Sequence, residues 1–345
     1  MAKWMGNPIA PTEKPAISII IPVHNGGAKF RLCLESVQRA IRSPNEIIVV
    51  ADGESDGSWR MAEELGIKVI TLPQTGGPAR ARNTGAQMAK GDILFFVDSD
   101  VTIPPDTLSH IHGIFQDDAG LAAVFGSYDD APAETNFFSQ YKNLFHHYVH
   151  QTSSEQASTF WGACGAIRRE IFWEIGGFDE NYRHPCIEDI ELGYRLKKAG
   201  HRIRLLKTLQ IKHLKRWGFI SLLKADLLYR AFPWSRLILR KKSMINDLNL
   251  KMSHRLSGIL VWMGVLFLPI AFYTSWALLT IFGVIMALLA LNWDLYRFYM
   301  SKRGFLFTLR AVPCHWLYYL YSTAAFGLVL AYNHLSKIGS LFRTS

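Results

Sequence analysis

Asp92-Ile-Leu-Phe-Phe-Val-Asp-Ser-Asp100 is the most informative stretch of this 345-residue chain. Five consecutive apolar residues are followed at once by two carboxylates that a single serine separates. Such a run is typical of a strand buried on both faces of a parallel sheet. Carboxylates at the end of that strand can face one divalent cation, which in turn neutralises a diphosphate. The structural alternative for Asp98 and Asp100 is a turn or a helix cap.

The residues before this stretch alternate between strand and helix patterns. β-branched runs predict three more strands, at residues 17–21, 46–50 and 67–72, and helical spacing predicts two helices, at residues 29–42 and 79–90. The alternation predicts an α/β fold with a Rossmann-like, mostly parallel sheet flanked by helices. Because ligands collect outside the carboxyl ends of such strands, the residues after Ile21, Val50 and Val97 should share one crevice.

The remaining segments differ in composition from this first part. Glycine-rich residues 159–206 predict a mixed region that completes the crevice, with one helix over residues 188–199. The expected organisation is a disordered leader at 1–15, an α/β domain at 16–212, basic amphipathic helices at 213–256, a transmembrane region at 257–335 and a tail at 336–345.

Composition and charge favour a membrane and an anionic partner. Hydrophobic residues make up 49% of the chain and charged residues 19%, which is more apolar than an ordinary soluble domain. The net charge of +10 suits a lipid headgroup, a nucleotide phosphate or a nucleic acid. Residues 213–256 mix basic side chains with Trp, Phe and Leu, which is typical of helices in the headgroup layer. Because the basic side chains are interleaved with these apolar residues, we expect a membrane as a partner, together with a nucleotide, and no nucleic acid.

Residues 257–293 contain no Asp, Glu, Lys, Arg or His. Since about 20 apolar residues cross a bilayer, we expect three spans, at residues 257–274, 275–293 and 311–332. Positive residues favour the cytoplasm, so the basic connection before the third span predicts a multi-pass inner or plasma membrane protein with a cytoplasmic α/β domain. The alternative is a set of buried core helices, against which the long absence of charge counts.

Several motifs follow one another along the chain. They are Ile20-Ile-Pro-Val-His-Asn25, Val50-Ala-Asp-Gly-Glu-Ser-Asp-Gly57, Gly76-Gly-Pro-Ala-Arg-Ala-Arg-Asn-Thr-Gly85, Asp98-Ser-Asp100, Gly176-Gly-Phe-Asp-Glu180 and Ile187-Glu-Asp-Ile-Glu191. In this order and spacing they resemble the inverting family-2 glycosyltransferases of the GT-A fold, over residues 16–217. The resemblance implies a nucleotide-sugar donor, typically UDP-linked, and a divalent metal, Mg²⁺ or Mn²⁺, as cofactor.

The resemblance implies that Asp52 binds the base or ribose of the nucleotide. The loop with Pro22, His24 and Asn25 would form the opposite wall. Ala51 stands where a second acidic residue is usual, which leaves the base open. A turn beside Gly53 is the structural alternative for Asp52.

Arg80, Arg82 and Asn83 follow a Gly-Gly-Pro turn at the start of a predicted helix. Two guanidinium groups and a helix N-terminus there would bind phosphate, and Asp98 would also contact the donor. A solvated basic face is the alternative for either arginine, while Asn83 would cap or fix the loop.

An inverting transfer needs a group that removes the proton of the acceptor hydroxyl. Glu188 and Asp189 match the acidic pair from which the family draws its base, so the resemblance assigns Asp189 as general base and Glu188 as the residue that orients acceptor or base. The alternative is a favourable interaction of both carboxylates with the helix dipole.

The resemblance also implies metal coordination by Asp98, Asp100 and His213. Alternatively, His213 begins a variant of the Gln-x-x-Arg-Trp motif of processive polysaccharide synthases. Both options place His213 and Trp217 beside the diphosphate and acceptor.

Three further residues are assigned to the acceptor and diphosphate side of the site. Arg216 belongs to the same segment as His213 and Trp217, and Trp161 and Gly162 resemble the family segment that contacts the donor sugar or acceptor. A tight turn would explain Gly162 equally well.

These expectations combine into inverting transfer of a sugar from a UDP-sugar to a membrane-associated lipid or polyprenyl-phosphate acceptor. The alternatives are a processive polysaccharide synthase and a non-catalytic scaffold that binds a nucleotide sugar. A dinucleotide-dependent oxidoreductase is disfavoured, because no G-x-G-x-x-G follows the first strand.

Overall fold

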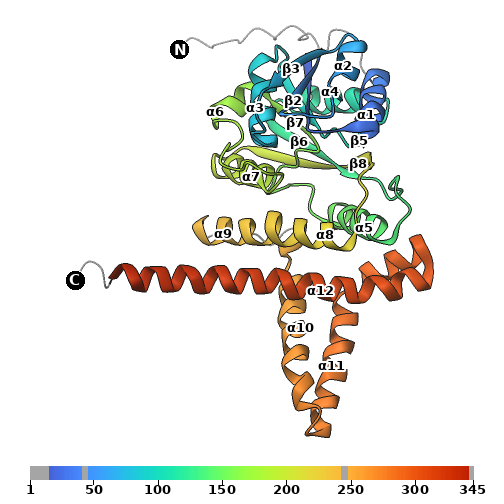
Figure 1. Ribbon diagram of the computed structural model, residues 1–345, viewed down its shortest axis with the longest axis vertical. Coiled ribbons are helices and arrows are strands. Elements are labelled where there is room, and N and C mark those ends of the chain that lie inside the picture. The colour runs from blue at the N-terminus through green and yellow to red at the C-terminus, as the bar shows by residue number, and fades with distance from the viewer. Residues whose placement is uncertain (1–14, 41–45, 242–247, 342–345) are drawn as a thin grey trace, which may run out of the picture.

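The computed structural model describes residues 15–40, 46–241 and 248–341. Figure 1 shows an α/β domain, a layer of helices beneath it, and a helical hairpin that projects away from that layer. The expected leader lies outside the described residues except for Pro15, and so does the end of the expected tail.

Half of the sheet consists of four parallel strands that come first in the sequence. They are β1 (Ile17–Val23), β2 (Glu46–Asp52), β3 (Lys68–Leu72) and β4 (Ile93–Val97). The sheet has eight strands in the order β3-β2-β1-β4-β7-β6-β8-β5. The four predicted strands and their parallel pairing are confirmed.

The other half of the sheet corrects the expectation of a mostly parallel arrangement. It contains β5 (Val101–Thr102), β6 (Leu121–Tyr128), β7 (Cys164–Arg168) and β8 (Arg202–His213). β7 lies antiparallel to both β4 and β6, and β5 lies antiparallel to β8, so the sheet is mixed. Cys164-Gly-Ala166 has little intrinsic strand preference, so pairing on both edges rather than local pattern places β7 in the sheet.

Both faces of the sheet are covered by helices. These are α1 (Gly27–Ala40), α2 (Arg60–Glu64), α3 (Pro78–Met88), α4 (Thr107–Asp117), α5 (Phe137–Thr152), α6 (Arg169–Glu174) and α7 (Glu188–Lys198). Phe95 packs in the apolar cluster that contains residues of α1 and α4, while Phe96 packs in the cluster that contains residues of α3 and α7. Successive strand residues point to opposite faces, so the unbroken apolar run of β4 is explained by burial on both sides.

The remaining helices form the lower part of the molecule in Figure 1. They are α8 (Phe219–Asp226), the π-helix η1 (Leu227–Ala231), α9 (Phe232–Lys241), the 3-10 helix η2 (Leu248–Leu250), α10 (Met252–Ile270), α11 (Ser275–Leu291) and α12 (Trp293–Leu341). α8, η1 and α9 follow one another without a break below the α/β domain, and α10 and α11 form the projecting hairpin.

The expectation of three membrane spans is not supported. Within the described residues one helix, α10, is long and apolar enough to cross a membrane; a second is counted only if α11 and α12, bent by 67° at their junction, form one broken span. The expected third span at 311–332 belongs to α12, which runs across the base of the hairpin (Figure 1). Ala311 and Tyr319 of this segment are buried in the protein, so its apolar character serves packing there. A multi-pass topology therefore has no support.

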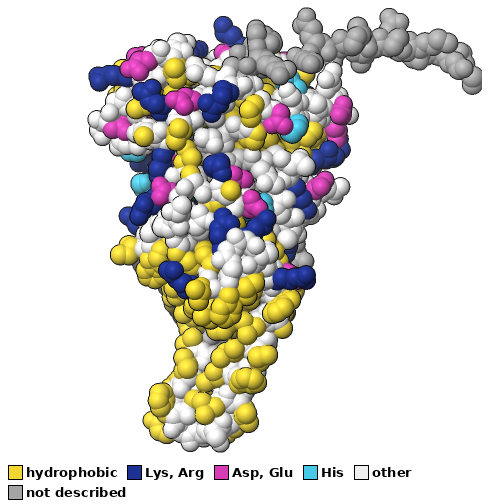
Figure 2. Space-filling model, turned by 90° about the vertical axis from the view of Figure 1, so that its right-hand side faces the viewer, with side chains coloured by type: hydrophobic (Ala, Val, Ile, Leu, Met, Phe, Trp, Pro, Cys, Tyr) yellow, Lys and Arg dark blue, Asp and Glu magenta, His cyan; other side chains and the backbone are white. Residues whose placement is uncertain are grey.

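The hairpin nevertheless exposes large apolar side chains. Leu266 is 63% exposed on α10, Leu279 is 74% exposed on α11, and Phe272 is 88% exposed at the turn between them. Figure 2 shows apolar side chains over the hairpin, with Lys, Arg, Asp and Glu gathered above it. A contiguous apolar surface of this kind marks contact with a membrane or another protein.

Candidate active site

Arg82 joins the end of β4 to the start of α7. Its guanidinium lies 2.7 Å from Asp98 Oδ1 and 2.8 Å from Glu188 Oε1, and its side chain is 5% exposed. Burial alone would lower the pKa of Arg82, but the two carboxylates raise it above its usual value, so the guanidinium stays charged. A Cβ on residue 162 would lie 3.0 Å from Arg82 Cζ, so Gly162 leaves the space that the guanidinium occupies. The predicted residues Arg82, Asp98, Glu188 and Gly162 therefore meet at one place.

Asp189 is the second residue of α7 and lies beside this ion-pair network. Its Oδ2 accepts a hydrogen bond of 3.0 Å from the Gly162 amide, and its Oδ1 accepts one of 2.8 Å from Ile190. Burial, followed by the nearby Glu188 carboxylate, raises the pKa of Asp189 to about 7. A carboxylate with a pKa near neutrality is suited to accept a proton from a substrate hydroxyl.

Glu188 is fixed more tightly than its neighbour. One carboxylate oxygen accepts from Arg82 and the other accepts from the Cys186 amide at 2.9 Å. Glu188 is 4% exposed and holds the start of α7. Asp189, although its oxygens also accept hydrogen bonds, is partly exposed and can therefore be reached by a ligand.

Asp100 and His213 come together because β5 pairs with β8. Val101 lies opposite His213, and the Leu214 amide donates to the Asp100 carbonyl oxygen at 2.8 Å. His213 Nε2 lies 3.8 Å from Asp100 Oδ2. Burial would raise the pKa of Asp100, but its interaction with the nearby His213 ring, followed by the charges of Lys215 and Lys29, outweighs burial and lowers that pKa to about 2.

The donor types of Asp100 and His213 fit a divalent cation such as Mn²⁺ or Mg²⁺. Among the described residues, however, no three Asp, Glu, His or Cys side chains gather closely enough to enclose one. The predicted set of Asp98, Asp100 and His213 is therefore not assembled as a unit, because Asp98 is held by Arg82. A cation at this position would need further ligands from the donor diphosphate or from water.

Asp52 holds the loop that precedes α3. Its two carboxylate oxygens accept from the Gly76 amide at 2.7 Å and the Gly77 amide at 2.8 Å. Gly77 has a φ of 89°, which favours glycine, and it is the N-cap of α3. Asp52 is 4% exposed, and its hydrogen bonds fix the conformation of the loop that enters α3.

The opposite wall is held by hydrogen bonds between two loops. His24 Nδ1 lies 2.7 Å from the Asp52 carbonyl oxygen, and Asn25 Oδ1 accepts from the amides of Ser55 and Asp56 at 2.9 and 3.2 Å. Pro22 lies opposite Val50 in the β1–β2 ladder. The segments after β1 and β2 thus form one rim, as expected from the parallel sheet.

Arg80 and Asn83 differ in their surroundings. Arg80 is exposed on the first turn of α3. Asn83 donates to the Phe178 carbonyl and to Glu180 Oε1, both at 2.9 Å, and accepts from the Phe178 amide. Asn83 therefore anchors the 178–180 loop, whereas the exposed Arg80 lies against Gly76 just before the helix N-terminus.

Trp217 and Arg216 lie in the segment that connects β8 to α8. The Trp217 amide donates to Ser139 at 2.7 Å and its carbonyl accepts from Asn136, while its ring packs against α5 and α12. The side chain of Arg216 is 70% exposed and pairs with Glu134 at 3.4 Å. These contacts fix the chain as it leaves the α/β domain.

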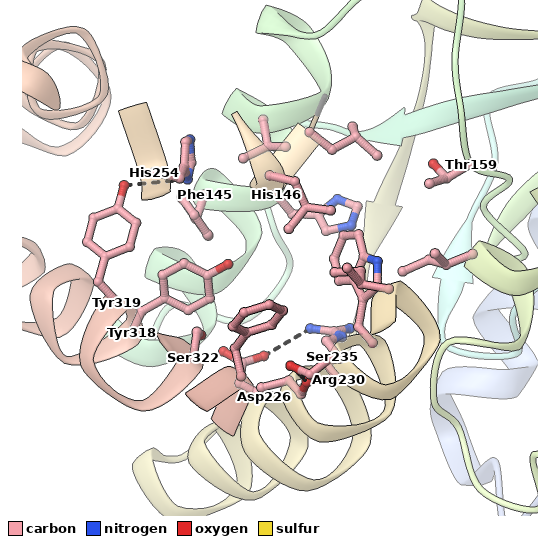
Figure 3. A pocket seen from close by; sticks show the side chains of 18 of the residues that line it. Phe145, His146, Thr159, Asp226, Arg230, Ser235, His254, Tyr318, Tyr319 and Ser322 are labelled. Atoms are coloured by element: carbon pink, nitrogen blue, oxygen red, sulfur yellow. Dashed lines mark hydrogen bonds and ion pairs between the residues drawn. The ribbon is translucent and has the colours of Figure 1, made fainter. Parts of the chain in front are cut away.

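A cavity of about 520 Å³ opens beside Asp189 and was not anticipated from the sequence. It lies between the α/β domain and the lower helices, and residues of α5, η1, α9, α10 and α12 line it. Trp161 is on its wall, with ring centroids 4.7 Å from Tyr128 and 5.1 Å from His146. Figure 3 shows Arg230 and Asp226 on one side and Tyr318, Tyr319 and Phe145 on the other. The i,i+4 spacing of Asp226 and Arg230 is the sequence signal that predicts a contact between these two residues of the cavity wall.

Comparison with known families matches two parts of the chain. Residues 18–176 match the family described as Glycosyl transferase family 2, and residues 144–217 match one described as N-terminal domain of galactosyltransferase.

Similar curated proteins include the probable glycosyltransferase YdaM of Bacillus subtilis, which is 27% identical over 219 residues, or 59% of this chain and 50% of that protein. The pre-mycofactocin glycosyltransferase of Mycobacterium tuberculosis is 30% identical over 221 residues, or 60% of this chain and 44% of that protein. The chain thus spans about half the length of these relatives.

Among solved structures, the mannosyltransferase PcManGT from Pyrobaculum calidifontis in complex with GDP-Man and Mn²⁺ is similar over 94% of this chain and 90% of that one. The TM-score is 0.57 and the identity 18%, a likeness that shows the fold alone.

Proposed function

We propose that this chain, which carries a glycosyltransferase family 2 domain over residues 18–176, transfers a sugar from a UDP-sugar to a hydroxyl group of a membrane-associated lipid acceptor. The observation that supports this most directly is the position of Asp189. It lies beside the Arg82–Glu188 pair and also on the wall of the cavity that reaches α10. A donor above and an acceptor within the cavity would meet at this carboxylate.

The donor half of the site would be the crevice at the carboxyl ends of β1, β2 and β4. Asp52 shapes the loop before α3 so that the helix N-terminus and Arg80 can face phosphate. Base or ribose recognition would come from the rim that includes His24 and Asn25. Asp100 and His213 would hold the divalent cation, which supplies positive charge for the diphosphate leaving group.

Asp189 would act as the general base. The acceptor oxygen attacks the anomeric carbon and its proton passes to the Asp189 carboxylate, while the bond from that carbon to the diphosphate oxygen breaks on the opposite face. The configuration inverts, and the nucleoside diphosphate leaves with the bonding electron pair. Glu188, held by Arg82 and the Cys186 amide, keeps the start of α7 in place during this step.

The hairpin would anchor the enzyme in the bilayer. α10 meets the length and composition of a span, and exposed apolar residues continue over α11. The basic helices above it would lie among the headgroups, with the α/β domain on the cytoplasmic side. This would put the mouth of the cavity near the lipids.

The test is to purify the full chain in detergent, supply a panel of UDP-sugars with a lipid extract and Mn²⁺ or Mg²⁺, and measure UDP release and new glycolipid by mass spectrometry. We expect lipid-dependent UDP release that Asp189→Asn lowers by about 100-fold or more, the usual range for loss of a general base. Absence of UDP release with every donor and metal would refute the proposal. Unchanged turnover in Asp189→Asn would favour a different base, and repeated addition of sugar would favour the processive alternative.

A further inference from the structure

An ion cluster with excess positive charge lies in the wall of the cavity. The Asp226 carboxylate at the end of α8 lies 2.6 Å from Lys142 Nζ on α5 and 3.1 Å from Arg230 Nη1, and it accepts a 2.9 Å hydrogen bond from Tyr321 on α12. The side chains of Lys142 and Asp226 are 12% and 5% exposed. The side chain of Arg230 is 43% exposed, so two cations, one buried and one partly exposed, share one buried carboxylate.

The backbone around Arg230 is specialised. η1 is a π-helix, and the Phe232 amide donates to the Leu227 carbonyl five residues earlier. Pro233 follows at once and has no amide hydrogen for a regular helical bond. A π-turn within a helix is uncommon and is found frequently at functional sites. Here it separates Asp226 from α9 and presents Arg230 to the cavity, as Figure 3 shows.

One positive charge of this cluster has no counter-ion within it. Lys142 is buried and needs a partner to offset its loss of hydration, and the one carboxylate of Asp226 serves both Lys142 and the partly exposed Arg230. Burial lowers the pKa of Lys142 to about 8 even though Asp226 acts to raise it. An added anion would complete the balance, and charge-assisted hydrogen bonds from Arg and Lys are well suited to phosphate.

The rest of the cavity wall is suited to a hydrocarbon chain. From the ion cluster it continues past Phe145 and Tyr318 to Ile259 on α10 and Phe326 on α12. Ile259 is 65% exposed on the candidate span, so the apolar wall continues onto the surface that would face lipid.

We propose that the Lys142–Asp226–Arg230 cluster binds the phosphate group of an anionic lipid acceptor, with the lipid chain directed along the apolar wall toward α10. The part of this inference that concerns the acceptor rests on the function proposed above. Asp189 lines the same cavity and would remove a proton from the reacting oxygen of the acceptor. A phosphate oxygen carries no such proton at neutral pH. The acceptor would therefore carry its phosphate and its reacting hydroxyl as different groups.

The test compares farnesyl phosphate with farnesol, which share one hydrocarbon chain. Binding to the full-length protein in a nonionic detergent is measured by native mass spectrometry, with inorganic phosphate as competitor. We expect the phosphate to strengthen binding by about tenfold or more, as for a hydrogen bond to a charged group, and Arg230→Gln to abolish that preference. Arg39→Gln on the exposed face of α1 removes the same charge elsewhere and should leave the preference intact.

Equal binding of the two ligands, or an unchanged preference in Arg230→Gln, would overturn the proposal. Displacement of farnesyl phosphate by similar concentrations of inorganic phosphate would also overturn it, since it would indicate a site for free anions.

Asp226→Asn separates ligand binding from a purely structural role. Removal of the carboxylate takes away the anion that competes with phosphate, so a folded Asp226→Asn variant should bind farnesyl phosphate more tightly than the parent. A cluster that only holds the helices together would instead lose binding in both Asp226→Asn and Arg230→Gln. Thermal melting of each variant checks its fold.

UDP release with donor and lipid extract is followed in parallel. Phosphate-dependent binding without UDP release would disprove the transferase proposal and leave the phosphate site standing. UDP release and transfer without a preference for the phosphate would disprove the phosphate site alone.

Discussion

The guanidinium of Arg82 lies 2.7 Å from Oδ1 of Asp98, and the same guanidinium holds Glu188 at 2.8 Å. The first acidic residue after β4 is therefore paired with a cation of the protein itself. Asp100, two residues later, lies 3.8 Å from His213 instead, and we propose it as the carboxylate that would hold the metal. Arg82 thereby links the end of β4 to the first turn of α7.

Arg82→Gln should therefore destabilise the protein. It leaves Asp98 and the buried Glu188 without their cation, and breaking a buried pair in this way lowers the free energy of unfolding by about 3–5 kcal/mol. Chemical denaturation should show this loss, while Arg31→Gln, which removes an exposed pair with Glu64 at 3.9 Å, should change it by less than about 1 kcal/mol. Similar small changes in both variants would mean that the Arg82 network contributes little to stability.

The first half of the fold follows from local sequence patterns. The strands at 17–23, 46–52, 68–72 and 93–97 and the helix at 78–88 all have a periodicity or an apolar run that a short window reveals. The second half depends on contacts between distant segments. β7 has a weak strand signal, and the path of α12 across the hairpin is set by packing of Ala311 and Tyr319.

The candidate site divides in the same way. The acidic residues after β4 are predicted because they stand at the end of a predicted strand, whereas the Glu188–Asp189 pair is predicted from its resemblance to the acidic pair of family-2 glycosyltransferases. The Arg82–Glu188 bond connects residues 106 positions apart, which no local pattern encodes. The Lys142–Asp226 pair, 84 positions apart, was missed for the same reason.

The pH dependence of turnover should report Asp189. A base must be deprotonated to act, and the pKa of Asp189 is raised to about 7, so kcat/KM should rise from pH 5.5, reach half of its maximum near pH 7 and level off about one pH unit higher. Steady-state rates with saturating metal across this range provide the measurement. A flat profile over the same range would exclude Asp189 as the titrating base.

The same raised pKa has a consequence for stability with the opposite sign. The folded state holds the Asp189 proton more tightly than the unfolded state, so this contribution to stability is fully present below the ordinary pKa near 3.8 and is lost as pH rises through about 7. Asp189→Asn mimics the protonated acid. The difference in melting temperature between this variant and the parent should therefore increase in favour of the variant as the pH rises from 5 to 8. A constant difference between the two melting curves would contradict this assignment.

Asp52 should act on donor affinity through the loop before α3. Asp52→Ala leaves the Gly76 and Gly77 amides without their acceptor, and each hydrogen bond to a charged group contributes about 1.5–3 kcal/mol. We expect UDP binding, measured by calorimetry, to weaken by about tenfold or more. Asp52→Asn keeps one acceptor oxygen and should show a smaller loss, while Asp117→Asn at the exposed end of α4 should show none. Equal UDP affinity in all three variants would remove Asp52 from the donor site.

Charge placed on the hairpin should release the protein from membranes without harming the α/β domain. Leu266 and Leu279 are 63% and 74% exposed on α10 and α11, and an arginine near the centre of a span is unfavourable by about 2.5–3.5 kcal/mol. Leu266→Arg with Leu279→Arg should therefore shift the chain from the membrane pellet to the supernatant after an alkaline wash. Leu32→Arg, at a 48% exposed apolar position on α1, should leave the distribution unchanged. UDP binding to the released double variant should match that of the parent, because both substitutions lie on the hairpin, which projects away from the α/β domain (Figure 1). If the double variant stays in the pellet while folded, the hairpin is not what holds this chain to the membrane.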